Sequence, residues 1–141
     1  MSVKKNVLIK IKGLRAGEGE DMELIVNGTC MKGGEKIYLS YEETDPDGSV
    51  YKCRIKLGPT EMVYTKSGIF TTELYYCVGE PYESVITTPY GRLDAEIVTE
   101  SLEYYDTPDT LVDMRLEYTL SINGEWASDC SLSVVAEEIG A

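Results

Sequence analysis

The residues whose types could do chemistry are few in this sequence, and their spacing does not bring them together. The 141 residues include no histidine, which removes the commonest general base and every Ser–His or Cys–His pair. Glu42 and Glu43 are adjacent carboxylates, but neighbours on a strand point to opposite faces, so they cannot act together as acid and base. The cysteines have no Cys-x-x-Cys pair, so their spacing does not indicate zinc. We expect no catalytic residue, no metal and no cofactor; the cysteines are Cys30, Cys53, Cys77 and Cys130.

Tyrosine is by far the most abundant aromatic residue that could face a binding site. The chain has eleven Tyr against one Phe and one Trp. Tyrosine suits a half-buried strand, because its ring packs while its hydroxyl stays in contact with water. A barrel interior that needs hydroxyl groups would use the same residue. The composition leaves both explanations open.

The clearest element that could position these side chains is a hairpin. Residues 112–122 alternate strictly between apolar and polar, which indicates a half-buried strand, and Asn123 and Gly124 separate it from a second alternating run. A two-residue turn there would pair polar with apolar residues. A three-residue loop with a left-handed Gly124 places Leu116 opposite Cys130 and matches the apolar rows. The sequence therefore predicts the three-residue loop.

Three more loops carry a glycine at their third position: 46–48, 66–68 and 89–91. All five prolines lie between the alternating runs, as an antiparallel sheet requires, because proline cannot donate to a ladder. Only the tail, residues 134–139, has a pattern that a short helical turn would also fit. The predicted cross-strand pairs are Tyr41 with Cys53 and Glu42 with Lys52 at the first loop, Tyr64 with Phe70 at the second, and Thr87 with Leu93 at the third.

The fold class follows from the number of these runs. Eight to ten strands joined mostly by hairpins, with little or no helix, are too many for a small open sheet. Long strands with one polar face favour closure into an antiparallel up-and-down β-barrel, and a β-sandwich is the alternative. We expect one domain over residues 1–141, because a chain of this length buries a core of its own.

Charge is unevenly distributed along the chain. The net charge is −12, yet residues 1–15 carry five cations and no acid, so the remaining residues carry −17. Such a surface repels phosphate backbones and anionic lipid, which argues against nucleic-acid and membrane binding. The first residues lack the apolar run of a signal peptide, so we expect a cytoplasmic protein whose four cysteines are free thiols.

Three stretches of the sequence resemble a known family. Residues 39–43 (Leu-Ser-Tyr-Glu-Glu), 88–93 (Thr-Pro-Tyr-Gly-Arg-Leu) and 116–124 (Leu-Glu-Tyr-Thr-Leu-Ser-Ile-Asn-Gly) are similar, in order and spacing, to the YwiB-like family of small bacterial proteins of unknown function. The resemblance extends along nearly the whole chain. It implies a calycin-like, lipocalin-type β-barrel and implies no activity.

Three functions fit this fold. The first is a non-enzymatic barrel that binds a small apolar or aromatic ligand inside. The second is an interaction module that offers its acidic outer face to a basic protein, as a monomer or as a homodimer paired through an edge strand. The third is an enzyme that uses Tyr, Arg and Glu inside the barrel. For the first function, the residues expected to line the interior are Tyr41, Glu43, Met62, Tyr64, Phe70, Tyr76, Met114 and Tyr118.

Overall fold

The computed structural model describes residues 4–15, 22–69, 71–88 and 90–139. Over these ranges the chain forms ten β-strands and no helix. The strands are β1 (Lys4–Arg15), β2 (Met22–Gly33), β3 (Lys36–Thr44), β4 (Val50–Leu57), β5 (Glu61–Ser67), β6 (Thr72–Cys77), β7 (Tyr82–Thr88), β8 (Gly91–Tyr104), β9 (Val112–Ile122) and β10 (Glu125–Glu138).

The ten strands form one antiparallel sheet in the order β6-β5-β4-β3-β2-β1-β10-β9-β8-β7. Strands that are neighbours in the chain therefore pair with each other, except β6 and β7, which form the two edges of the sheet. In addition, β1 pairs with β10. The sheet curls until β6 and β7 meet, where Ser84 Oγ donates to the Glu73 carbonyl oxygen at 2.8 Å. Isolated bridges join Cys77 to Glu80 and Val78 to Thr99 at the same seam. The all-β, up-and-down barrel is confirmed, and it is nearly closed.

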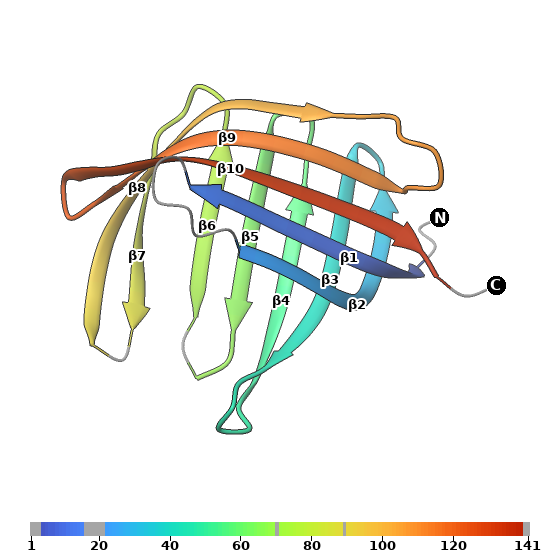
Figure 1. Cartoon of the computed structure of the whole chain (residues 1–141), viewed down its shortest axis with the longest axis horizontal. Coiled ribbons are helices and arrows are strands. Elements are labelled where there is room, and N and C mark those ends of the chain that lie inside the picture. The colour runs from blue at the N-terminus through green and yellow to red at the C-terminus, as the bar shows by residue number, and fades with distance from the viewer. Residues whose placement is uncertain (1–3, 16–21, 70, 89, 140–141) are drawn as a thin grey trace.

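The two walls of the barrel cross each other. Strands β1, β2, β9 and β10 run across β3 to β6 in Figure 1, as expected for a strongly twisted sheet that folds back on itself. One end of the barrel is filled by side chains that are 3% exposed or less, among them Val7, Leu39, Leu57, Val112, Met114, Leu116 and Ala136. The opposite end carries the β3–β4 and β9–β10 turns.

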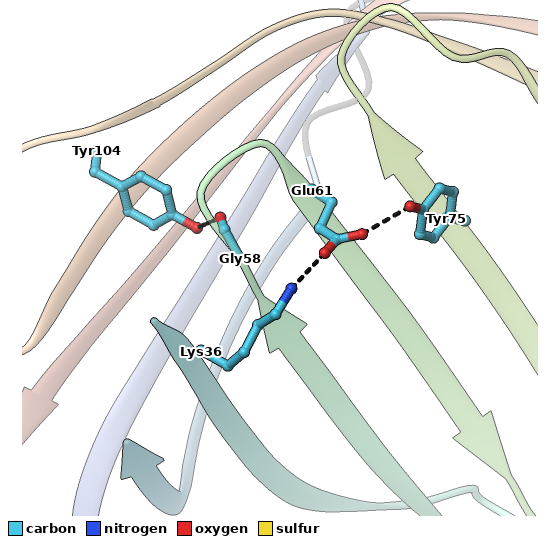
Figure 2. A network of polar contacts seen from close by, with 5 residues as sticks. All are labelled: Lys36, Gly58, Glu61, Tyr75 and Tyr104. Carbon is cyan, nitrogen blue, oxygen red and sulfur yellow. Dashed lines mark hydrogen bonds and ion pairs between the residues drawn. The ribbon is translucent and has the colours of Figure 1, made fainter. Parts of the chain in front are cut away.

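Polar contacts also hold the packed end together (Figure 2). Glu61, at the start of β5, forms an ion pair with Lys36 of β3 and accepts a hydrogen bond of 2.7 Å from the Tyr75 hydroxyl. The Tyr104 hydroxyl, at the end of β8, donates to the Gly58 carbonyl oxygen beside β4. The hydrogen bond from Lys36 is the main reason that the pKa of Glu61 is lowered. These contacts join four strands and the β4–β5 turn.

The β3–β4 register is the one predicted from the sequence. Tyr41 lies opposite Cys53 and Glu42 lies opposite Lys52, and Gly48 has a φ of 92°. The prediction holds because a Pro-Asp-Gly loop and two matched rows of side chains require the same register.

The β9–β10 register differs from the prediction. Leu116 lies opposite Leu132, not Cys130. Asn123 and Gly124 form a two-residue turn with φ angles of 51° and 83°, a conformation that Asn and Gly adopt readily. A register shift between Trp126 and Ser128 follows. This bulge restores the match of apolar rows that the two-residue turn by itself would lose.

Three other local predictions are wrong. Thr87 lies opposite Arg92 instead of Leu93, because the β7–β8 ladder extends to the pair Thr88–Gly91. Tyr64 lies opposite Leu74, since β6 begins only at Thr72; Phe70, its expected partner, lies outside the described residues. The tail is strand, not helix: β10 continues to Glu138 because β1 provides it with a partner.

Candidate functional site

A cavity of about 550 Å³ occupies the end of the barrel that is not packed. It lies between the two crossing walls. Most of its wall is apolar or aromatic, with a few polar groups at its rim. The lining residues are Ile11, Gly13, Glu23, Leu24, Tyr41, Glu43, Ile55, Met62, Tyr64, Leu74, Tyr76, Tyr118, Leu120, Cys130, Ser131 and Leu132.

The cavity exists because two neighbouring strands separate. The ladder between β2 and β3 ends at the pair Thr29–Ser40, while β2 continues to pair with β1 back to Met22. Gly28 marks the separation: a Cβ there would collide with the Ser40 carbonyl oxygen and with Ile9. Beyond this point the two walls diverge, so fewer side chains meet across the barrel.

Four tyrosines reach this cavity. The rings of Tyr76 and Tyr118 meet edge to face, with centroids 5.0 Å apart, and the Tyr64 hydroxyl lies 3.9 Å from Cys53 Sγ. Burial raises the pKa of Tyr76 to about 12. Burial is also the main cause that raises the pKa of Tyr41, Tyr64 and Tyr118. The four phenols are therefore protonated at neutral pH and can donate hydrogen bonds to a guest molecule.

A charged pair stands near the cavity mouth. Lys66 Nζ lies 2.8 Å from Glu43 Oε2, and their side chains are 29% and 27% exposed. The ammonium also lies 4.8 Å from the centroid of the Tyr51 ring, within the range of a cation–π contact. The hydrogen bond to Glu43 is the main cause that raises the pKa of Lys66. Glu43 thus reaches the cavity as half of an ion pair.

The structure brings together six of the eight residues expected to line the interior: Tyr41, Glu43, Met62, Tyr64, Tyr76 and Tyr118. Met114 is fully buried in the packed end and does not reach the cavity. Phe70 lies outside the described residues. Sequence reasoning missed Lys66, which it assigned to a loop, although this residue lies opposite the inward-facing Cys53. Four lining leucines were also missed: Leu24, Leu74, Leu120 and Leu132. The alternation of apolar and polar residues in their strands is the signal that indicates their inward-facing positions.

The thiol and phenol groups in and beside the cavity favour their protonated forms. Burial raises the pKa of the Cys53 thiol, which disfavours the reactive thiolate. The raised pKa values of the tyrosines disfavour a phenolate base in the same way. Arg54, Arg92 and Arg115 are exposed on the outside of the barrel. Among the described residues, no three His, Cys, Asp or Glu side chains are grouped to hold a metal ion.

These features define a small antiparallel barrel with one packed end and one hollow end. Residues 8–134 match the family described as "Domain of unknown function (DUF1934)", and the chain belongs to that family. The crystal structure of the ywiB protein from Bacillus subtilis is similar, with a TM-score of 0.75 at 17% identity, over 97% of this chain and 94% of that one. The resemblance to YwiB-like proteins is thereby confirmed, and the likeness shows the shared fold.

No curated protein matches the chain. Within the described ranges, no helix has the length and hydropathy that a membrane crossing needs.

Proposed function

We propose that the barrel binds a small, mostly apolar or aromatic molecule in its interior cavity and does not transform it. The observation that carries this proposal is the hollow end itself. A volume of about 550 Å³ falls in the range of roughly 300–1,000 Å³ that is typical of small-molecule sites. The packed end supports the proposal, because the same strands fill the interior there with buried side chains.

The lining indicates the chemistry of the ligand. Ile11, Leu24, Leu120 and Leu132 offer an apolar wall, which favours an aliphatic or aromatic body. Donors from protonated phenols favour one or two acceptor oxygens on that body. Met62 lies among them, and a flexible thioether adapts to more than one shape of guest.

A titration with uncharged fluorescent probes, such as N-phenyl-1-naphthylamine, tests the proposal. The wild-type protein should enhance the emission of the probe with a saturable, one-site curve. Leu74→Trp should place an indole ring in the cavity and weaken binding of the probe, because Leu74 lines the cavity. Val98→Trp is the matched control, since Val98 lies on the outside of β8 and does not line the cavity; it should bind like wild type.

A second set of variants tests the role of the hydroxyls. Tyr118→Phe retains the ring that contacts Tyr76 and removes one hydrogen-bond donor. It should therefore weaken the binding of a probe with a carbonyl acceptor and leave the binding of a pure hydrocarbon probe unchanged. Tyr118→Ala should weaken the binding of both probes. Absence of any saturable binding, or equal loss in Leu74→Trp and Val98→Trp, would contradict the proposal.

A second candidate function rests on the acidic outer face of β7 to β10, which would dock a basic protein. Its carboxylates include Glu83, Asp94, Glu96, Glu100 and Asp129. Glu83 lies directly opposite Glu96 across the β7–β8 ladder, a like-charge pairing that destabilises a sheet and that a basic partner would relieve. Capture of a Lys-rich probe peptide that is lost in Glu83→Gln/Glu96→Gln would support this candidate.

A further inference from the structure

The outer face of β2 to β5 carries a trough that is distinct from the interior cavity. Two hollows of about 580 and 500 Å³ share Thr29, Ser40, Arg54 and Thr65, so they adjoin. The first opens where β2 and β3 separate. The second extends toward the packed end, past Lys4 and Lys56. Together they form one depression along the outside of β3 and β4, which we call the outer trough.

The charge of the outer trough is opposite to that of the whole protein. It is lined by Lys4, Lys52, Arg54 and Lys56, against the single carboxylate of Glu42. None of these four cations forms an ion pair with a residue that the structure describes. On a chain of net charge −12, this group of cations without ion-pair partners is a local positive surface, which is complementary in charge to an acidic partner.

The three cations of β4 form a regular row. Lys52, Arg54 and Lys56 occupy alternate positions of one strand, so they are spaced about 7 Å apart on the outer face. An extended polypeptide laid along β4 presents its own alternate side chains at the same interval. Hydroxyls of Ser40 and Thr65 flank the row and can bond to a peptide backbone.

We propose that the outer trough binds an extended acidic segment of another protein, with Asp or Glu at alternate positions. A nucleic acid is disfavoured because its phosphate backbone continues beyond the trough and would lie against the acidic remainder of the surface. The trough also lacks the row of aromatic rings on which single-stranded bases stack, since Tyr38 is the one aromatic ring on its outward-facing lining. A short acidic segment bound in the trough interacts mainly with the cations of the trough. Salt screens the repulsion from surface carboxylates that lie farther away than a Debye length of about 8 Å.

Fluorescence anisotropy with a labelled peptide of about twelve residues, alternating Glu and Thr, tests this proposal. The wild-type protein should bind it, and added salt should weaken binding. The variant Lys52→Gln/Arg54→Gln/Lys56→Gln should weaken binding about tenfold, as three exposed charge contacts would. The matched control is Lys12→Gln/Lys32→Gln/Arg92→Gln, which removes the same charge from exposed positions outside the trough; it should bind within about twofold of wild type.

Three outcomes would overturn the proposal. The first is no binding of the acidic peptide by the folded wild-type protein. The second is equal weakening in the two triple variants, which would show that only overall charge matters. The third is tighter binding of an oligonucleotide of matched charge, lost in the trough variant, which would assign the surface to nucleic acid. Circular dichroism melting curves of both variants verify that they remain folded.

Discussion

A matched pair of leucine substitutions tests whether the barrel has one packed end and one hollow end. Leu116 and Leu132 lie directly opposite each other on β9 and β10. Leu116 is fully buried, whereas Leu132 is partly exposed and lines the cavity. The two side chains are chemically identical, so replacing each with alanine isolates the effect of the surroundings.

The magnitudes follow from what each side chain touches. Leu116→Ala removes apolar contact on all sides and leaves a void in close-packed surroundings, which costs about 3–5 kcal/mol of unfolding free energy. Leu132→Ala enlarges a space that is already open. Leu132→Ala should therefore lower the unfolding free energy by only about 1 kcal/mol, which is part of the free energy of transferring the side chain out of water. The difference between the two variants is therefore about 2 kcal/mol or more.

Urea denaturation followed by tyrosine fluorescence and circular dichroism measures both values from the shift in midpoint at constant slope. The two variants should have the same slope as wild type. Equal costs for Leu116→Ala and Leu132→Ala would refute the distinction between the ends, because it would mean that Leu132 is packed as tightly as its partner.

Three further predictions concern stability and redox state. Gly28→Ala should destabilise the barrel by about 1–3 kcal/mol, measured by urea denaturation, because the added Cβ meets the Ser40 carbonyl oxygen and not a movable side chain alone; an unchanged midpoint would contradict this. The lowered pKa of Glu61 contributes stability that is present above its unfolded pKa of about 4.5 and is lost as pH falls through the folded value. The advantage of wild type over Glu61→Gln should therefore shrink below about pH 4.5, and an advantage independent of pH would refute the role of the ion pair. Alkylation of denatured, unreduced protein should add a label to every cysteine, since all four are free, and two labels would show a disulfide.

Alternation in the sequence is sufficient to predict which side chains face inward but not where they lie along the barrel axis. Tyr41 and Met114 both belong to inward-facing rows, yet Tyr41 lines the cavity and Met114 is buried in the packed end. Which inward-facing side chains reach the cavity depends on where β2 and β3 separate. This position is set by contacts between distant strands, so a period-two pattern does not contain it.

Turn chemistry determines how far the register can be predicted. At 46–48, the loop residues and the side-chain rows require the same pairing, and the prediction is confirmed. At Asn123 the left-handed backbone makes a two-residue turn, which would place apolar residues opposite polar ones. The register shift between Trp126 and Ser128 restores the apolar match. The Asn-Gly pair favours a two-residue turn, whereas matching the apolar rows without a bulge favours a three-residue loop, and the prediction followed the second signal. The same uncertainty in loop length hid Lys66, which lies in β5 and not in a turn.

The most direct test of the binding proposal is a crystal structure of the protein with a neutral aromatic probe. The account predicts that the probe lies in the interior cavity, against the rings of Tyr76 and Tyr118, with any acceptor oxygen within hydrogen-bond distance of a tyrosine hydroxyl. A probe bound only on the outer surface, or a cavity that stays without it at saturating concentration, would contradict the account.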